Sequence, residues 1–233
     1  MILLLFTVVI VSLNIGEYLI GVNLKNVDTI NLSSIPGRQR CLMLAGEPYS
    51  LILSEADGIS SYKVKVERRL SNLREYFSNK RSVEEILSKG EDPLIYTVYE
   101  IPRGAEGELD VGYTIIYPGK IGKEYYFTKG HFHAKDFTSE VYIGMRGEGK
   151  ILMQDRRGET KVLEIKPNVL VYIPPGFAHR SINTGNSELV FLAIYPSDAG
   201  HDYDTIRKTG FAKIVIEKDG KPILVDNPNY VRL

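Results

Sequence analysis

Several kinds of residue are scarce in this chain of 233 residues, and their scarcity excludes whole classes of protein. The only cysteine is Cys41, so no disulfide can form within the chain and a disulfide-stapled secreted module is excluded. Twenty-nine basic and 29 acidic residues give a net charge of zero. Because nucleic acids are bound by basic surfaces, we expect no nucleic-acid partner. The hydrophobic fraction, 43%, is that of an ordinary globular protein.

The longest apolar run stands at the N-terminus and is short for a membrane span. Residues 2–13 carry no charge, whereas a spanning helix needs about 20 apolar residues. The first basic residue, Lys25, follows the run, although a secretory signal has its basic residues in front. Three interpretations stay open: an anchor or unusual signal, an element packed on the domain, or a wrongly chosen start codon with Met43 as the true start. We divide the chain into an extension, residues 1–45, and a domain, residues 46–233, and expect membrane contact only if the apolar run is real.

Two helices are predicted in the first part of the domain. Residues 62–77 place apolar side chains at spacings of three and four, as on one face of a helix. These side chains are Val66, Leu70, Leu73 and Phe77. Ser82 and Glu85 have the spacing of a capping box, which predicts a short helix that ends at Gly90.

Beyond Asp92 the chain consists of short segments rich in Val, Ile and Tyr, separated by turn residues. The segments are LIYTVYEI, GYTIIYPG, EVYIGM, KILMQ, KVLEI, VLVYIPPG and LVFLAIYP. Many short strands at such regular spacing predict an all-β sandwich or barrel. Strands and helices do not alternate, which disfavours a Rossmann fold or a TIM barrel.

The four histidines all follow residue 130, and three of them suggest a metal site. His131 and His133 would lie on the same face of a strand, because side chains two residues apart point the same way. Glu140 opens the next strand-like segment, and His179 follows the turn PPGFA. Three imidazoles and one carboxylate suit a divalent transition metal with room for water or substrate. By itself, a His-x-His pair would equally fit a polar surface loop.

The spacing of these residues resembles the two motifs of the cupin superfamily. The first motif is matched by His131, His133, Glu140 and Gly147, and the second by Pro174, Gly176, His179 and Asn183. Six residues separate His133 from Glu140, where three or four are usual. Asn168 replaces the glycine that opens the second motif, and asparagine tolerates the left-handed conformation of a turn.

Three longer segments narrow the resemblance to the archaeal-type, cupin-fold phosphoglucose isomerases. They are YPGKIGKEYYFTKGHFHAK, YIPPGFAHRSINTG and AIYPSDAGHDYDTI, and the likeness covers about residues 50–228 but not 1–42. The resemblance implies a mainly β fold, a cupin double-stranded β-helix (jelly-roll) barrel with a few flanking helices. It also implies a cytoplasmic homodimer that interconverts glucose 6-phosphate and fructose 6-phosphate in glycolysis and gluconeogenesis.

The resemblance further implies one divalent metal ion per subunit, with Fe²⁺ expected first and Zn²⁺, Ni²⁺ or Mn²⁺ also suited to nitrogen and oxygen ligands. The implied ligands are His131, His133, Glu140 and His179. Glu140 is also the candidate base for proton transfer, although metal coordination weakens a carboxylate as a base. A hydride shift that needs no base therefore stays open, and so does the use of mannose 6-phosphate.

Roles in binding the phosphosugar substrate follow from the same resemblance. Contacts to the phosphate are expected from Thr114, Thr128, Lys129 and Gly130. Contacts to the sugar hydroxyls are expected from Tyr96, Tyr142, Tyr195 and Tyr203. His201 is expected to assist ring opening or bind a hydroxyl. Without the resemblance, the threonines would be interpreted as strand residues, the tyrosines as core and His201 as a buried structural residue.

A barrel of this kind also fits two alternative functions. A cupin dioxygenase with Fe(II) would use the same three histidines and carboxylate, but the Thr128-Lys129-Gly130 segment and the tyrosines suit a phosphosugar better. A non-catalytic sugar-binding cupin is disfavoured because all four metal ligands are present.

Overall fold

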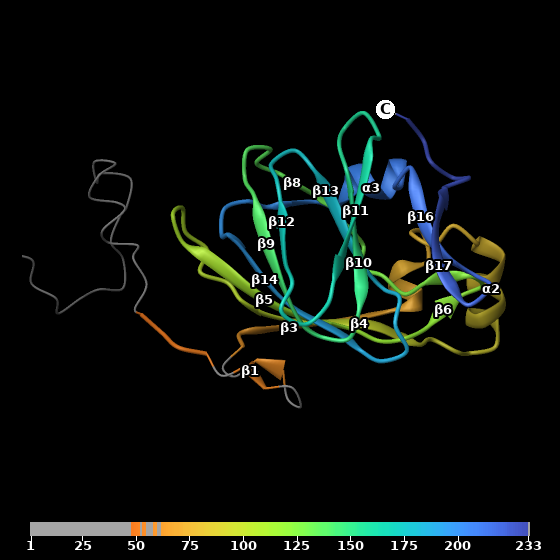
Figure 1. Cartoon of the computed structure of the whole chain (residues 1–233), viewed down its shortest axis with the longest axis horizontal. Helices are drawn as coiled ribbons and strands as arrows, with labels where there is room; N and C mark the ends of the chain where they lie inside the picture. The colour runs from red at the N-terminus through yellow and green to blue at the C-terminus, as the bar shows by residue number, and fades with distance from the viewer. Residues whose placement is uncertain (1–47, 52, 55–57, 60–61, 233) are drawn as a thin grey trace, which may run out of the picture. The chain divides into compact units, whose positions relative to one another are not determined.

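The computed structural model describes residues 48–51, 53–54, 58–59 and 62–232 (Figure 1). All of them belong to one compact unit, Cys41–Leu233. The predicted extension, residues 1–45, lies outside the described residues, and so do its apolar run and Met43. None of the described helices is long and apolar enough to cross a membrane.

The described chain is mainly β, and its largest sheet has six antiparallel strands in the order β12-β9-β14-β5-β4-β3. Its strands are β3 (Val64–Arg69), β4 (Leu94–Ile101), β5 (Leu109–Ile116), β9 (Glu140–Arg146), β12 (Leu170–Ile173) and β14 (Leu189–Pro196). A three-stranded sheet has the order β11-β10-β13. It comprises β10 (Gly149–Gln154), β11 (Thr160–Ile165) and β13 (Ala178–Asn183). Every strand-like segment predicted from the sequence contributes to one of these two sheets.

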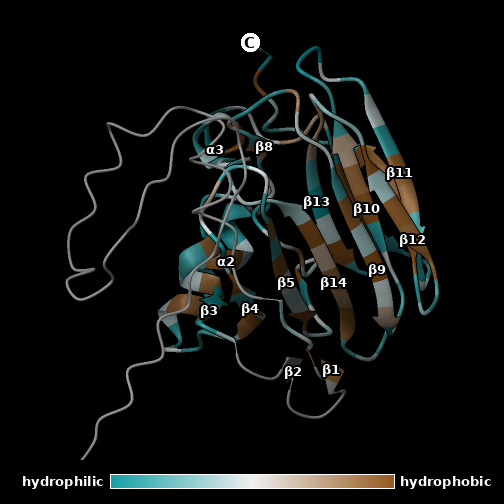
Figure 2. Ribbon diagram, turned by 90° about the vertical axis from the view of Figure 1, so that its left-hand side faces the viewer, coloured by the Kyte–Doolittle hydropathy of each residue, from teal (hydrophilic) through white to brown (hydrophobic). Residues whose placement is uncertain are grey.

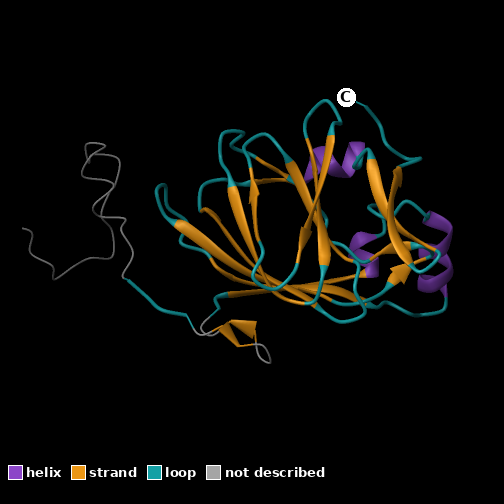
Figure 3. Cartoon of the chain, in the orientation of Figure 1, coloured by secondary structure: helices purple, strands orange, loops and turns teal. Residues whose placement is uncertain are grey.

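Shorter strands and a few helices complete the described unit (Figure 3). A four-stranded sheet has the order β17-β16-β7-β6. It comprises β6 (Lys120–Ile121), β7 (Glu124–Tyr125), β16 (Lys213–Lys218) and β17 (Lys221–Asp226). Two two-stranded pairs are β1 (Leu53–Ser54) with β2 (Gly58–Ile59), and β8 (Phe132–His133) with β15 (His201–Asp202). The helices are the 3-10 helix η2 (Leu70–Leu73), α2 (Lys80–Ser88) and α3 (Tyr203–Thr209).

The strands pair in a nested order that identifies the barrel. β8 pairs with β15, β9 with β14 and β10 with β13, all antiparallel. A long hairpin folded back in this way is a double-stranded β-helix, or jelly roll. The predicted cupin barrel is therefore confirmed. Its core combines both large sheets, with Ile116 and Phe191 from one and Ile151 and Ile182 from the other.

Figure 2 shows bands of different hydropathy along the strands of the six-stranded sheet. Because successive side chains of a strand point to opposite sides, this sheet has two different faces. One face turns toward the barrel interior. The other carries a second apolar cluster of three buried residues, Ile101, Tyr113 and Val190, with partly buried neighbours. These neighbours include Tyr99, Ile115, Met145 and Leu192.

The predicted helix over residues 62–77 is wrong in its first half. Residues Val64–Arg69 form β3, which pairs with β4. Val64 and Val66 alternate with charged residues, and β-branched residues in alternation favour a strand. Pairing with β4 therefore prevails over the three- and four-residue spacing. Only the part after Arg69 turns helically, as η2, where Leu70 and Leu73 are fully buried.

The second predicted helix is confirmed as α2, but its cap lies elsewhere. The Asn79 side chain accepts a hydrogen bond from the Ser82 backbone N–H at 3.0 Å, so Asn79 is the N-cap and Ser82 lies inside the helix. Gly90 follows the helix with φ of 78°. Asn168 has φ of 66°, so the predicted left-handed turn is also confirmed.

Candidate metal centre and active site

Four side chains of the barrel interior converge as the sequence predicts. His131, His133, Glu140 and His179 each offer one ligand atom, and these atoms all lie within 4.8 Å of one another. His133 lies on β8, Glu140 opens β9, and His179 lies on β13. His131 joins them through an isolated bridge, in which His131 and His179 exchange backbone hydrogen bonds of 3.3 and 3.1 Å.

One carboxylate oxygen stands between two of the imidazoles. Glu140 Oε2 lies 3.1 Å from His133 Nε2 and 2.9 Å from His179 Nε2. On its other side, His133 Nδ1 lies 2.8 Å from the Thr138 hydroxyl and 3.1 Å from the Thr138 carbonyl. Metal-binding histidines are commonly oriented by such an outer hydrogen bond. His133, Glu140 and His179 are all buried.

The Glu140 carboxylate is negatively charged at neutral pH. Burial would raise the pKa of Glu140, but the neighbouring His179 imidazole and the hydrogen bond with His133 lower it to about 2. The pKa of His131 is lowered well below 6.5, chiefly by burial and then by the neighbouring histidines. At neutral pH the site therefore combines an anionic Glu140 with a neutral His131, the protonation states that metal ligands require.

The donor atoms fit a divalent transition metal. His131 Nε2 and His179 Nε2 are buried, and neither has a hydrogen-bond partner among the described residues. The proximity of His179 Nε2 to Glu140 thus lacks hydrogen-bonding geometry. Ligand bonds of about 2.1 Å place ligand atoms roughly 3–4 Å apart around an ion. Glu140 Oε2 lies 3.1 and 2.9 Å from two of the nitrogens, and all four ligand atoms lie within 4.8 Å of one another. Two buried nitrogens without partners are what a metal ion would satisfy.

A hollow of about 540 Å³, including the solvent at its mouth, adjoins the cluster. Its floor is the interior face of the six-stranded sheet, and the segment 128–130 lines it as well. All the residues predicted to contact substrate line this hollow. They are Tyr96, Thr114, Thr128, Lys129, Gly130, Tyr142, Tyr195, His201 and Tyr203. The structure thus brings together side chains that are up to 107 residues apart, counting from Tyr96 to Tyr203.

The comparisons with known proteins agree with this arrangement. The family model described as glucose-6-phosphate isomerase matches residues 67–232, which include all four residues of the metal cluster. The chain belongs to the glucose-6-phosphate isomerase family. Its relatives include glucose-6-phosphate isomerases of Pyrococcus abyssi, 46% identical over 185 residues, and of Thermococcus kodakarensis, 47% identical over 184 residues. The two matches cover 79% and 78% of this chain, and 97% and 96% of the relatives.

Solved structures share part of the barrel at low similarity. An oxalate oxidase is 16% identical with a TM-score of 0.39, and the match covers 49% of this chain and 58% of the other. The oxalate decarboxylase of Bacillus subtilis is 20% identical with a TM-score of 0.37, covering 44% of this chain and 26% of the other. No conclusion about activity follows at these scores.

The 128–130 segment of this family member is hydrogen-bonded to β13. The Thr128 N–H donates to the Ser181 carbonyl at 2.9 Å, and the Ser181 N–H donates to the Thr128 hydroxyl at 3.1 Å. Gly130 has φ of 75°, and a Cβ there would lie 2.6 Å from the Phe211 ring and 3.0 Å from the His179 carbonyl oxygen. Only glycine fits this position, which lies directly before the first metal-cluster histidine.

Rings surround the predicted metal position. The His131 and His201 rings lie edge to face, 4.4 Å apart between centroids, and the His201 and Tyr203 rings stack at 5.6 Å. The Tyr195 ring lies 5.6 Å from that of His201. His201 is accessible to solvent, so the alternative interpretation as a buried structural residue does not fit.

Glu100 also lines the hollow, and the sequence interpretation missed it. Burial raises the pKa of Glu100, Asp110 raises it further, and Arg68 opposes them. The signal was available in the alternation of β4, because Glu100 lies four residues after Tyr96 and shares its face of the strand.

Proposed function

We propose that the protein is a metal-dependent glucose-6-phosphate isomerase that interconverts glucose 6-phosphate and fructose 6-phosphate, in glycolysis and gluconeogenesis. One observation carries the proposal: three histidines and a glutamate converge beside a polar hollow in a chain similar to enzymes of that name along almost their whole length. The convergence supplies what an aldose–ketose isomerisation needs, which is a site for a Lewis acid next to a site for a phosphosugar.

We propose His131, His133, Glu140 and His179 as the ligands of one divalent ion per subunit. The mixed nitrogen and oxygen donors suit Fe²⁺, our first choice, and also Zn²⁺, Ni²⁺ or Mn²⁺. A bound ion would act as a Lewis acid toward the sugar oxygens beside the carbons that exchange hydrogen. Burial of the ligands would keep bulk water away from this position.

For the phosphate we propose the hydroxyls of Thr114 and Thr128, the Gly130 backbone N–H and the charge of Lys129. The left-handed conformation of Gly130 lets a backbone N–H approach an anion without a side chain in the way. Lys129 lies beside this backbone, and burial lowers its pKa. A phosphate bound here would orient the sugar along the interior face of the sheet.

For the sugar we propose the hydroxyls of Tyr96, Tyr142, Tyr195 and Tyr203. Burial raises the pKa of Tyr96 to about 12, so its hydroxyl stays protonated and can donate to a sugar oxygen. We assign His201 to ring opening, because its ring contacts those of both His131 and Tyr203 and remains open to solvent.

For the hydrogen transfer we propose Glu140 as the base that moves a proton between C1 and C2. One observation favours a second route: a pKa of about 2 makes Glu140 a weak base at neutral pH. In that route hydrogen moves between the two carbons as hydride and Glu140 serves as a ligand only. The two routes differ in whether hydrogen from the solvent enters the sugar.

An assay for conversion of fructose 6-phosphate to glucose 6-phosphate, coupled to a dehydrogenase, tests the proposed function. We expect turnover with the metal-bound protein, loss of turnover with a chelator, and recovery when a divalent metal is added back. No turnover with any of Fe²⁺, Zn²⁺, Ni²⁺ or Mn²⁺ would contradict the proposal. The cupin dioxygenase alternative would then be examined by oxygen consumption.

We further propose that the protein is a cytoplasmic homodimer. The apolar cluster on the outer face of the six-stranded sheet supports this, because Tyr99, Ile115 and Leu192 are only partly covered there. A second copy of the chain would bury this face. Sedimentation at micromolar concentration should show a dimer, and a single monomeric species would refute the dimer.

A further inference from the structure

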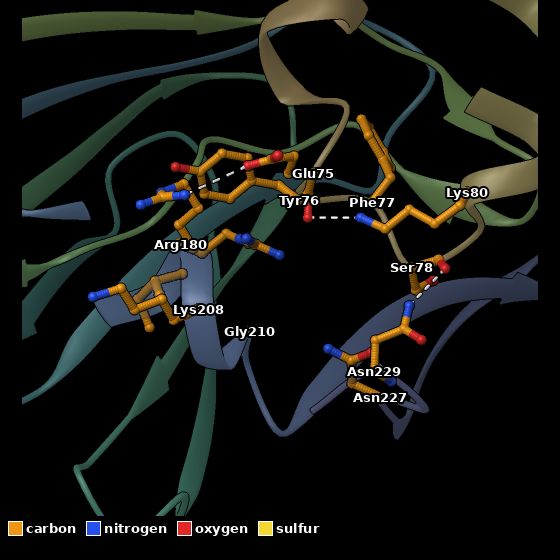
Figure 4. A pocket seen from close by; sticks show the side chains of 12 residues that line it. Glu75, Tyr76, Phe77, Ser78, Lys80, Arg180, Lys208, Gly210, Asn227 and Asn229 are labelled. Carbon is orange, nitrogen blue, oxygen red and sulfur yellow. Dashed lines mark hydrogen bonds and ion pairs between the residues drawn. The ribbon is translucent and has the colours of Figure 1, made fainter. Parts of the chain in front are cut away.

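A second hollow lies among the segment 75–80, the C-terminal part of α3 and the residues after β17 (Figure 4). It has a volume of about 360 Å³, including the solvent at its mouth. It shares no lining residue with the hollow beside the metal cluster. The two are therefore separate sites in the described part of the chain.

The lining of this second hollow is strongly basic in a chain with no net charge. Four cationic residues line it, and the only acidic residue among the lining is Glu75. The cationic residues are Lys80, Arg180, Arg207 and Lys208. In Figure 4, Lys80 and Ser78 lie on one side, Arg180 and Lys208 on the other, and Asn227 and Asn229 below.

Arg180 is the unusual member of this group, because it is only 3% exposed and has no carboxylate within ion-pair distance among the described residues. Its guanidinium lies between two aromatic rings, 4.1 Å from the centroid of Phe127 and 4.7 Å from that of Phe211. Its hydrogen bonds, from Nη2 at 2.7 Å and Nε at 3.3 Å, both reach the carbonyl of Lys129.

A buried cation in this state lacks a paired counter-charge. A guanidinium has five N–H donors, and the two hydrogen bonds of Arg180 use donors on Nε and Nη2 only. Removing a charge from water is costly unless a counter-charge meets it, and arginine pairs best with carboxylate or phosphate.

The other cations differ in how free they are to bind an anion. Lys80 Nζ donates to the backbone carbonyls of Glu75 at 2.7 Å and Arg74 at 3.3 Å, and no carboxylate of the described residues forms an ion pair with it. Arg207 is already paired, with Asp204 at 3.1 Å and Glu75 at 3.9 Å. Lys80, Arg180 and the exposed Lys208 thus have no carboxylate partner among the described residues, and Arg180 is the buried one of the three.

We propose that this hollow binds a small phosphate-bearing anion, with Arg180 and Lys80 as its main cationic contacts. The anion would supply the counter-charge that Arg180 lacks, and the remaining guanidinium N–H groups would donate to its oxygens. Inorganic phosphate and the phosphate of a small monoester share this chemistry. The site does not depend on the proposed isomerase activity, since none of its residues lines the substrate hollow.

Calorimetric titration of the metal-bound, full-length protein with inorganic phosphate, at ionic strength fixed with sodium chloride, tests the site. The wild-type chain should bind two phosphates, one in each hollow. Lys80→Gln should weaken one of them about ten- to a hundred-fold, as expected for the loss of a charge-assisted contact. Thr114→Val should weaken only the other, and Lys80→Gln should leave turnover and KM for fructose 6-phosphate unchanged.

Arg81→Gln is the matched control, because Arg81 is the next residue of α2 and pairs with Glu85 outside the hollow. It should leave both phosphates in place. If Lys80→Gln lowers the melting temperature, Arg207→Gln replaces it, since Arg207 lines the same hollow near its exposed rim.

A repeat titration with glycerol 3-phosphate identifies the source of the phosphate. Binding of inorganic phosphate alone points to the free ion, binding of both points to a monoester, and either supports the site. A single phosphate per chain that is lost in Thr114→Val would overturn the proposal. Two phosphates that are both indifferent to Lys80→Gln and Arg207→Gln would do the same. Because the readout is binding, failure of the isomerase assay would leave this test unaffected.

Discussion

Replacing Glu140 by glutamine separates the two routes for hydrogen transfer. The glutamine keeps the shape of the side chain and one coordinating oxygen, but it cannot take up a proton. A general base contributes about 10²- to 10⁴-fold to a rate. Since the pKa of Glu140 is about 2, its tendency to take a proton is weak, and we expect a loss near 10²-fold if it is the base.

His179→Ala serves as the comparison, because His179 contacts the same Glu140 oxygen but has no proposed part in proton transfer. Its loss should act through metal affinity, so excess metal should restore part of the rate while three ligands remain. Glu140→Gln should not recover at saturating metal if Glu140 is the base. If hydrogen moves as hydride, both variants should recover to a similar extent.

Reaction in deuterium oxide gives an independent readout. Proton abstraction allows exchange with solvent, so deuterium should enter C1 or C2 of the product, as measured by mass spectrometry. A hydride shift leaves the carbon-bound hydrogen unexchanged. Product free of deuterium, together with metal rescue of Glu140→Gln, would refute the base role and leave Glu140 as a ligand.

Three further predictions follow from the same structure. Metal removal should abolish isomerase activity but leave most of the circular dichroism of the β-strands, because the barrel has its own apolar core; full activity in a rigorously metal-free sample would contradict the metal requirement. A chain that starts at Met43 should keep its turnover number, since all predicted metal ligands follow residue 130. A large loss of turnover in a normally folded protein would show that the extension reaches the site. The melting temperature of the metal-free protein should fall as pH falls below about 6.5, because His131 is then protonated in the unfolded chain, while burial keeps its pKa lower in the folded protein. Measured from pH 7.5 to 5.5, the melting temperature of His131→Asn should depend less on pH than that of the wild type.

Local spacing indicated the metal cluster, and the resemblance to the phosphoglucose isomerases supplied the residues of the substrate hollow that lie far apart in the sequence. His131 and His133 lie two residues apart, and the turn before His179 delivers it to a neighbouring strand, so motif spacing was enough to assemble the cluster. The jelly roll followed from the cupin resemblance that these motifs carry, whereas the regular spacing of the strand-like segments indicated only an all-β sandwich or barrel.

Tertiary packing decided the parts that local patterns missed. Residues Val64–Arg69 became a strand because β4 was available to pair with them, which no spacing within the segment reveals. Glu100 lines the substrate hollow because side chains along β4 alternate between its two faces. The second hollow was beyond sequence interpretation, because Arg180 meets the segment 75–80 only after β13 and α2 have been brought together.

The reciprocal backbone contact between His131 and His179 has a consequence for how the site assembles during folding. His131, His133 and Glu140 lie within ten residues, whereas His179 comes 39 residues after Glu140 and arrives only when β13 has paired with β10. Closing such a loop costs chain entropy that a local contact does not. His131, His133 and Glu140 can therefore come together early in folding. His179 joins them only when the barrel closes. Stopped-flow refolding with a metal whose absorbance responds to coordination would time that closure against the appearance of strand structure.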